Sequence, residues 1–369
     1  MKDVEDIKSM THNRSKGNIL HICNFSAAYK GNFMSSLLAL EEYLKEKGLK
    51  QIYIFPARAN KTDAKKWIEE LRNNGHIIYT QSESIKENLL LFNRIKKEYN
   101  IVTVFRHFAD YKTDFLTWLI FGKKKIVRFF HCEYKRDKFP KFEIKRFVYK
   151  NETLVGVSKP VTEQIKKNFP NNKSATIENA IDFARLDTPE DFDKRSGITC
   201  LAMGYNPIVK GADLAIKAVA KLQKKNHVHL YIVAASHFDE LMNTVSEIEG
   251  NTPDWLTILP PAENVSTYYS NTDIFLAPSR SEGFSYAVPE SAYCKSTIVF
   301  SDIPAHKNLS VNQRYMFKSE DLSDFCQKLQ LAIDELHSDD SETKKEKTKC
   351  DVIQNYGLDR WCREVYELI

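Results

Sequence analysis

The sequence predicts two α/β domains in tandem, each built on a parallel sheet covered by helices on both faces. Its length, 369 residues, suits two domains of ordinary size better than one. Short runs of consecutive apolar residues alternate with amphipathic stretches, as expected for strands buried on both faces and the helices that cover them. A polar, proline-containing stretch at 187–195 interrupts this alternation near the middle of the chain, which indicates a domain boundary.

Each half of the chain supplies its own set of strands and helices. In the first half we expect strands at 18–23, 51–55, 76–79, 101–105, 126–130, 154–157 and 175–178, and helices at 32–46, 63–73, 85–99 and 159–167. In the second half we expect strands at 198–203, 229–234, 256–259, 274–277 and 297–300, and helices at 212–224, 238–249, 263–270, 286–294, 321–336 and 358–368. We place the domains at 1–185 and 186–356. Ligands bind beyond the carboxyl ends of such strands, so the cleft between the domains is the predicted site.

Composition and charge narrow the class of protein. The seven cysteines are scattered, odd in number and without a C-x-x-C pair, which favours reduced thiols in the cytoplasm. The first residues are polar and resemble no signal peptide, and no apolar run approaches the ~20 residues of a membrane helix. The net charge is +5. The segment 135–150 holds seven basic and two acidic residues, interleaved with aromatics. It could contact an anionic membrane, form a solvated helix or bind nucleic acid, but no nucleic-acid motif accompanies it.

The segment 277–290 carries the clearest chemical signal. It follows a predicted strand and opens a helix, and Gly283 permits close approach of the backbone. Backbone amides at the helix start can bind a diphosphate; they belong to Phe284, Ser285 and Tyr286. Glu290, inside the helix, can accept hydrogen bonds from two ribose hydroxyls, and Glu282 can hold sugar hydroxyls. The alternative is that both glutamates are ordinary surface or capping residues.

This segment resembles the E-x7-E motif of retaining glycosyltransferases of the GT-B fold, in particular glycosyltransferase family 4. Three further segments resemble family motifs in the expected order: 179–182 (Asn-Ala-Ile-Asp), 204–211 (a strand-to-helix loop ending in Lys-Gly) and 301–306 (Ser-Asp-Ile-Pro-Ala-His). The resemblance covers nearly the whole chain and is strongest between residues 204 and 306. It implies two Rossmann-like domains facing a central cleft, with the final helix, within 357–369, crossing back onto the first domain.

The resemblance also assigns roles in the second domain. Lys210 would stabilise the departing diphosphate as a mobile positive charge. The family usually has an arginine after the first glycine of this loop, whereas this chain has Tyr205. Arg280 is a candidate to replace that arginine. A solvated lysine at a helix start is the alternative for Lys210, although the helix dipole disfavours it there.

In the first domain, the candidates follow predicted strands. Gly31 lies between the first strand and its helix, where amides would approach the donor, although a simple turn would explain it equally well. His107 and His131 follow the fourth and fifth strands, and by resemblance they lie near the reacting sugar. Either histidine could instead be structural. Glu133 and Tyr134, just beyond, could shape the acceptor pocket.

The resemblance implies a retaining hexosyltransferase that takes a sugar from a nucleotide-diphosphate donor to a glycan or lipid-linked acceptor. Cell-envelope polysaccharide or glycolipid synthesis, at the inner face of the cell membrane, is the setting it suggests. We expect no metal and no cofactor, and the Asp-Phe-Asp triplet at 191–193 is not read as a metal motif because it lies in the predicted linker. Two rivals stay open: a sugar-nucleotide epimerase on the same fold, and a catalytically silent sugar- or lipid-binding protein, which the tyrosine at 205 favours.

Overall fold

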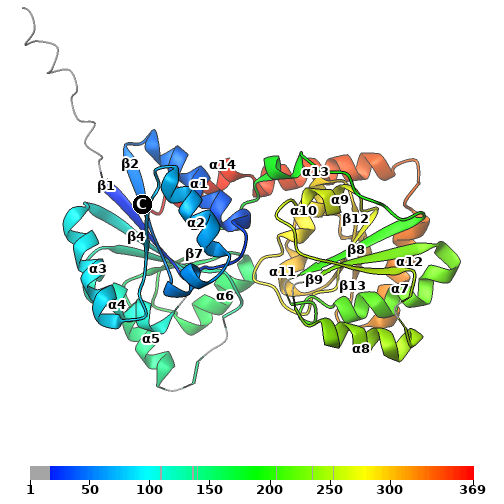
Figure 1. Cartoon of the computed structure of the whole chain (residues 1–369), viewed down its shortest axis with the longest axis horizontal. Coiled ribbons are helices and arrows are strands. Elements are labelled where there is room, and N and C mark those ends of the chain that lie inside the picture. The colour runs from blue at the N-terminus through cyan, green and yellow to red at the C-terminus, as the bar shows by residue number, and fades with distance from the viewer. Residues whose placement is uncertain are drawn as a thin grey trace, which may run out of the picture.

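Two α/β domains lie side by side along the long axis of the molecule (Figure 1). The computed structural model describes residues 17–369 except Ala109, Lys135, Arg136, Phe139, Tyr205, Ala235 and Thr252. Within this described part, the first sheet has seven strands in the order β3-β2-β1-β4-β5-β6-β7, and the second has six in the order β10-β9-β8-β11-β12-β13. The pairings within both sheets are parallel. The predicted fold class is therefore confirmed.

The first domain alternates strands and helices as the apolar pattern predicts. Its strands are β1 (Gly17–Cys23), β2 (Leu49–Phe55), β3 (Ile77–Thr80), β4 (Ile101–His107), β5 (Lys125–Phe130), β6 (Thr153–Gly156) and β7 (Ser174–Thr176). Its helices are α1 (Gly31–Lys45), η1 (Ala57–Lys61), α2 (Ala64–Asn73), α3 (Ile85–Glu98), α4 (Tyr111–Phe121), α5 (Lys141–Tyr149) and α6 (Lys159–Asn168). Helix η2 (Phe183–Leu186) leads into the linker.

The second domain repeats this alternation around a smaller sheet. Its strands are β8 (Ile198–Gly204), β9 (Val228–Ala234), β10 (Leu256–Leu259), β11 (Ile274–Ala277), β12 (Thr297–Ser301) and β13 (Met316–Phe317). Its helices are α7 (Ala212–Asn226), α8 (Phe238–Glu249), α9 (Ser266–Ser270), α10 (Ala287–Tyr293), α11 (Pro304–Lys307), η3 (Gln313–Tyr315), α12 (Leu322–Asp334), α13 (Ser341–Tyr356) and α14 (Leu358–Tyr366).

Several of these elements lack the pattern that would have predicted them. Helix α4 is apolar around most of its surface, so it shows no amphipathic period. Helix α13 is rich in charged residues, and only Val352 and Tyr356 are buried in it. The two-residue strand β13 is too short to leave a signal. In each case packing in the folded domain, not local sequence pattern, determines the element.

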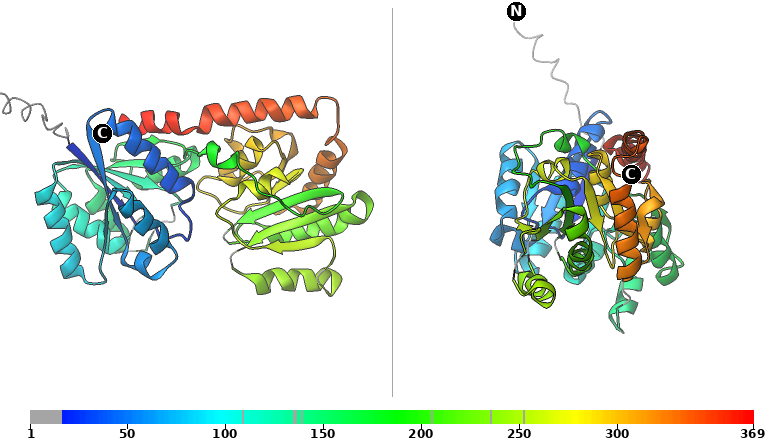
Figure 2. Two further views of the ribbon diagram at one scale, coloured as in Figure 1. Left: turned by 45° about the horizontal axis from the view of Figure 1, so that its top comes forward. Right: turned by 90° about the vertical axis from the view of Figure 1, so that its right-hand side faces the viewer.

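The chain returns to the first domain at its C-terminal end. Helix α13 runs over the second domain, and α14 continues from it onto the first (Figure 2, left). Trp361, Cys362 and Val365 of α14 belong to the core that also holds α1, α2 and the face of the first sheet beneath them. A backbone bridge between Ile181 and Gly357 joins the two crossing segments. The chain thus passes between the two domains twice, once near Ile181 and once near Gly357, and these two segments lie against each other.

A buried group of charges lies on the other face of the first sheet. Arg106 and Arg128 both pair with Asp114, the latter at 2.7 Å, and Arg128 also binds Glu152 at 2.7 Å. The Tyr149 hydroxyl donates to Asp114 at 2.7 Å. Burial alone would raise the pKa of Asp114, but the charges of Arg128 and Arg106 outweigh it and hold that pKa well below its usual range.

Replacing Asp114 with Ala should destabilise the protein by about 3–5 kcal/mol, because it leaves two buried guanidinium groups without their shared partner. Urea unfolding followed by circular dichroism measures this loss. Glu98→Gln is the matched control, since Glu98 forms an exposed ion pair with Arg94 that should contribute less than about 0.5 kcal/mol. A loss below about 1 kcal/mol in the Asp114 variant would contradict this account of the cluster.

Candidate active site

The two domains make backbone contact at Gly283, in the loop between β11 and α10. A Cβ atom at this position would lie 2.2 Å from the backbone oxygen of His131 and 2.8 Å from Cα of Cys132. The Ser158 hydroxyl donates to the backbone oxygen of Gly283 at 2.6 Å. The Ser281 hydroxyl donates to the Glu133 carboxylate at 2.8 Å. Because His131 follows β5 and Gly283 follows β11, the carboxyl ends of the two sheets face each other here.

Glu282 and Lys210 form an ion pair at this junction. Nζ of Lys210 contacts Oε1 of Glu282, and the Ser279 hydroxyl donates to the same oxygen at 3.0 Å. A Cβ at Gly204 would meet Cγ of Lys210 at 2.2 Å, so the lysine side chain lies directly across this glycine. The Glu282 side chain is largely buried, whereas that of Lys210 is 29% exposed. The predicted pair is therefore assembled, with its positive group accessible to a ligand.

Glu290 lies at a second contact between the domains. Its Oε1 atom accepts from Nδ2 of Asn32 at 2.8 Å and from a guanidinium nitrogen of Arg185 at 3.0 Å, and its Oε2 accepts from the Tyr269 hydroxyl at 2.8 Å. Burial and the neighbouring carboxylate raise the pKa of Tyr269, which keeps that hydroxyl a donor. Asn32, Arg185 and Tyr269 were not predicted, since single polar residues on separate elements leave no spacing pattern. Oε2 retains capacity to accept one further hydrogen bond.

Of the residues between the two glutamates, some have side chains packed in the core, and some have backbone N–H groups available to a ligand. Phe284 is buried and its ring packs against those of Tyr286 and Tyr356. Ser285 is also buried. Among the described residues, none accepts a hydrogen bond from the backbone N–H groups of Phe284, Ser285 or Tyr286. These amides precede the first residue of α10, and they can bind an anion as the sequence suggested.

Arg280 is engaged away from this group, and its role in donor binding stays a prediction. Its guanidinium binds both carboxylate oxygens of Asp213, at 2.7 and 2.8 Å, and it also pairs with Glu320 and with the backbone oxygen of Ile208. Two carboxylates and a carbonyl occupy its donors, so it anchors the 278–282 loop to the start of α7. Tyr205, which prompted the idea of a substitute, lies outside the described residues.

His107 and His131 lie in direct contact at the ends of β4 and β5. Nδ1 of His107 is 3.1 Å from Nε2 of His131, and Nε2 of His107 is 3.3 Å from Nδ1 of His21 in β1. Burial lowers the pKa of His21 and of His131 to about 3. Burial and the adjacent imidazoles lower the pKa of His107 well below its usual value. All three rings are therefore neutral at physiological pH. His21 was not predicted as a site residue, because a histidine within an apolar strand is expected to be part of the hydrophobic core.

A cavity of about 400 Å³ opens between the domains. The first domain contributes Tyr29, Lys30, Gly31 and Ser35, the linker contributes Arg185, and the second domain contributes Met203, Gly204, Val233 and residues 261–265 except Asn264. Gly31 has φ +53°, a conformation that favours glycine, and it begins α1. A cavity of this size can accommodate a nucleoside.

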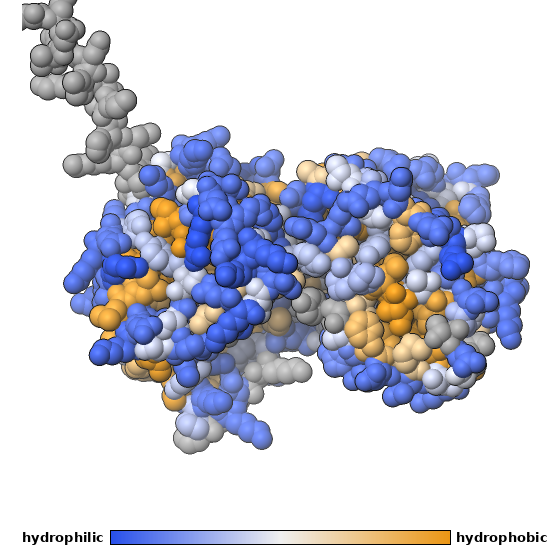
Figure 3. Space-filling model, viewed as in Figure 1, coloured by the Kyte–Doolittle hydropathy of each residue, from blue (hydrophilic) through white to orange (hydrophobic). Residues whose placement is uncertain are grey.

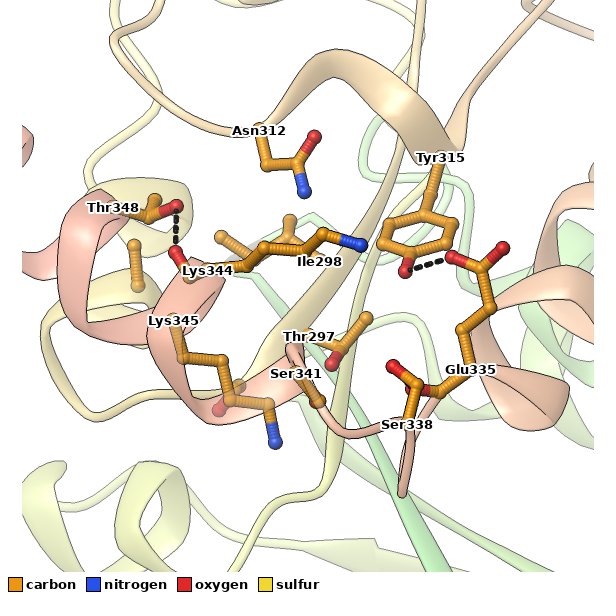
Figure 4. Close-up of a pocket in the computed structure, with 12 residues that line it drawn as sticks. Thr297, Ile298, Asn312, Tyr315, Glu335, Ser338, Ser341, Lys344, Lys345 and Thr348 are labelled. Atoms are coloured by element: carbon orange, nitrogen blue, oxygen red, sulfur yellow. Dashed lines mark hydrogen bonds between the residues drawn. The ribbon is translucent and has the colours of Figure 1, made fainter.

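A second hollow lies on the far side of α10, against α13 (Figure 4). Lys344, Lys345 and Thr348 reach it from α13, and Tyr315 hydrogen-bonds Glu335 across it at 2.8 Å. It leaves about 30 Å³, room for roughly one water molecule. The interdomain cavity is therefore the better candidate for a substrate site.

Comparison with known families agrees with this geometry. Residues 197–335 match the family model described as glycosyl transferases group 1. This stretch contains β8 to α12, with Lys210, Glu282 and Glu290. Residues 197–335 form a group 1 glycosyltransferase domain. The comparison with curated proteins found no match.

Solved structures resemble both domains of the chain and their arrangement. A glycosyltransferase from Rickettsia africae has a TM-score of 0.79 at 19% identity, covering 96% of this chain and 97% of that one. Sucrose-phosphate synthase from Thermosynechococcus elongatus has a TM-score of 0.74 at 14% identity, covering 96% of this chain and 98% of that one. Anabaena HepE in complex with UDP-glucose has a TM-score of 0.74 at 11% identity, covering 95% of this chain and 98% of that one. The chain with its group 1 glycosyltransferase domain thus has the GT-B fold.

Replacing Gly283 with Ala should force the group 1 glycosyltransferase domain away from the first domain, since the methyl group would meet backbone atoms that cannot rotate away. We expect a loss of about 1–3 kcal/mol in unfolding free energy. Hydrogen exchange should become faster at 131–134 and 281–285. Gly17→Ala is the control, because its methyl group would meet only the Val102 side chain. Unchanged exchange in both segments would show that the contact does not hold the domains together.

Proposed function

We propose that the protein is a retaining glycosyltransferase that transfers a hexose from a nucleotide-diphosphate sugar to an acceptor hydroxyl. One observation carries the proposal. Gly204 and Arg185 line the interdomain cavity; the side chain of Lys210, paired with Glu282, lies across Gly204, and Arg185 binds Glu290. Lys210, both glutamates and the amides at 284–286 all belong to the stretch that matches the group 1 glycosyltransferase model. A cation and unpaired backbone N–H groups side by side suit a diphosphate. Carboxylates on either side suit the hydroxyls of ribose and sugar.

The proposed donor lies with its nucleoside in the cavity and its sugar toward the histidines. Glu290 accepts from a ribose hydroxyl through the free capacity of Oε2, and Glu282 orients the sugar. Lys210 and the amides stabilise the negative charge that develops on the leaving diphosphate, which lowers the barrier to bond cleavage. The leaving phosphate accepts the proton of the incoming hydroxyl on the same face of the sugar, so configuration is retained. These groups supply the charge stabilisation without a metal, and we propose that EDTA leaves the rate unchanged.

The rival functions share this fold and are separated by the products they give. Incubation with a panel of nucleotide sugars and acceptors, followed by mass spectrometry, distinguishes them. Free nucleotide together with a glycosylated acceptor supports transfer. An isomerised nucleotide sugar would instead identify an epimerase, and binding without turnover would identify a silent binding protein. Proton NMR of the first-formed product reports whether the anomeric configuration is retained.

Two substitutions test the assigned roles in that assay. Glu290→Gln should weaken donor binding about tenfold, since an amide cannot accept all the hydrogen bonds that the carboxylate accepts. Lys210→Ala should lower kcat by about 100-fold, because it removes a positive charge beside the leaving group. Calorimetry with the nucleotide sugar and initial-rate kinetics measure the two effects. The matched controls are Glu247→Gln in α8 and Lys221→Ala in α7, both exposed. Kinetics unchanged in both site variants would overturn the assignment.

We further propose that the first domain docks on an anionic membrane that carries a lipid-linked acceptor. Within the described part of the basic segment 135–150, Phe142 and Tyr149 are buried in the core, whereas Phe147 is 61% exposed. Further exposed apolar side chains lie on the neighbouring helix α4. Tyr111, Phe115 and Leu119 recur every fourth residue and are each about half exposed, so they form one stripe along the helix.

Exposed basic residues occur on α4, in the turn after it, and on and just after α5. They are Lys112, Lys123, Lys124, Lys141, Arg146 and Lys150. Apolar residues gather over α3 and α4 on the face shown in Figure 3, where Ile85 and Leu90 of α3 are also exposed. Apolar side chains flanked by cations suit the interface of an anionic bilayer. None of the described helices is long and apolar enough to cross a membrane.

Replacing Phe115 and Phe147 together with Ser should reduce binding to vesicles of anionic lipid by at least fivefold, because two exposed aromatic rings are lost from the docking face. Co-sedimentation with phosphatidylglycerol vesicles measures this, and vesicles of phosphatidylcholine alone should bind weakly. Ile353→Ser, an exposed position on α13, is the control. Equal binding of the wild type to both kinds of vesicle, or no change in the double variant, would contradict the proposal.

A further inference from the structure

Three histidines form a continuous row across the first sheet. His21 and His107 lie in the adjacent strands β1 and β4, and His131 directly follows the next strand, β5. The row runs from the fully buried His21 through the buried His107 to the partly buried His131, whose backbone contacts Gly283. The two ring-to-ring nitrogen distances are 3.3 and 3.1 Å. Of the three residues, His131 is the one whose backbone contacts the second domain, at Gly283, so we argue that His21 and His107 influence the site through His131.

The row can hold its protons in only two ways. A neutral imidazole has one nitrogen that donates and one that accepts. Aromatic rings enclose the row, with Tyr53 and Phe105 on His21 and Phe129 on His107. Since all three rings are neutral, both hydrogen bonds must point the same way along the row. Either every ring donates toward the cleft or every ring donates away from it.

Gln51 of β2, at the inner end of the row, selects between the two directions. We assign its amide orientation from its hydrogen-bond partners: with the oxygen accepting from the backbone N–H of Glu41 at 3.2 Å, the nitrogen lies 2.6 Å from the Tyr53 hydroxyl, 3.2 Å from Nε2 of His21 and 3.3 Å from the backbone oxygen of Leu37. The Tyr53 hydroxyl can pass its own proton on to the Glu41 carboxylate, 2.7 Å away. An amide nitrogen only donates, so Nε2 of His21 accepts and the His21 proton is on Nδ1.

We propose that Gln51 and His21 are positioning residues that fix His131 in the Nδ1–H tautomer. Nδ1–H of His21 donates to Nε2 of His107, and Nδ1–H of His107 donates to Nε2 of His131. The remaining proton of His131 is therefore on Nδ1, and among the described residues none hydrogen-bonds this atom. The hydrogen bond at one ring nitrogen sets the tautomer at the other.

The ring of His131 is also held in orientation. Phe108 stacks on it with ring centroids 4.2 Å apart, and Phe33 meets it edge-on at 5.4 Å. Phe108 has φ +55°, a backbone conformation that side-chain-bearing residues rarely adopt and that often marks a functional site. The row thus ends in a ring of fixed orientation on the residue whose backbone contacts Gly283. Resting on the proposed function, we assign the acceptor of its Nδ1–H as an oxygen of the transferred sugar.

Nitrogen-15 NMR of the histidine-labelled protein tests the tautomer directly and needs no activity. We expect protonated Nδ1 and unprotonated Nε2 at His131, with the signal assigned by its loss in His131→Gln. In His21→Leu the inner donor is gone, so His131 should shift toward the Nε2–H form that free imidazole side chains prefer. An Nε2–H tautomer at His131 in the wild type would overturn the proposal, even if the leucine variant fails to fold. An Nδ1–H form that persists in a folded His21→Leu protein would overturn it as well.

Kinetics then connect the tautomer to the reaction. His21→Leu should lower kcat about tenfold with the donor KM changed less than twofold, because the fixed hydrogen bond acts on the sugar and not on the nucleotide. His21→Asn places an amide N–H near the former Nδ1–H and should restore most of the rate and the Nδ1–H signal. His229→Asn, a buried histidine of the second domain, is the control. Equal rates in the wild type and His21→Leu would overturn the role in positioning, whereas absence of transfer in every protein would overturn only the proposed function.

Discussion

Contact between two backbones, at Gly283 and His131, fixes how the domains of this protein meet. No side chain fits between them, so the loop after β11 approaches the end of β5 as closely as two chains can. Hydrogen bonds from Ser158 and Ser281 surround this contact. The position of every candidate group follows from it, because the ion pair of Lys210 and Glu282 flanks Gly283 on one side and the row of histidines ends on the other. A small displacement of either sheet would move Lys210 and Glu282 away from His131.

Much of the fold could be predicted from the sequence, and for a simple physical reason. Strands buried on both faces must be apolar along their length, which makes them visible without any structure. The motif from Glu282 to Glu290 was equally visible, because its glycine and glutamates are contiguous in the chain. The group 1 glycosyltransferase match lies over this same half. Helices α4 and α13 could not be found in this way. Helix α4 has no distinct polar face, and α13 has almost no apolar face.

The polar environment of the site was much less predictable than the motif itself. Glu290 is bound by Asn32 from α1, Arg185 from the linker and Tyr269 from α9, and these three lie far apart in sequence. Arg280 is near the motif in sequence but pairs elsewhere in the fold. Its proximity to the motif suggested a phosphate ligand, but Asp213 offers it a bidentate carboxylate, the geometry that a guanidinium prefers. Sequence shows which residues are present, whereas partner choice depends on which side chains the fold brings within 3 Å.

The crossing of α14 onto the first domain has a consequence for biosynthesis. Domains generally fold as they leave the ribosome, the N-terminal one first. Here Trp361, Cys362 and Val365, which follow the second domain in the sequence, complete the core beneath α1. The first domain therefore emerges early but waits, with an apolar surface uncovered, until the second domain has been synthesised and folded. During that interval it is exposed to aggregation and to chaperones, and the exposure ends only once α14 has been translated and has packed.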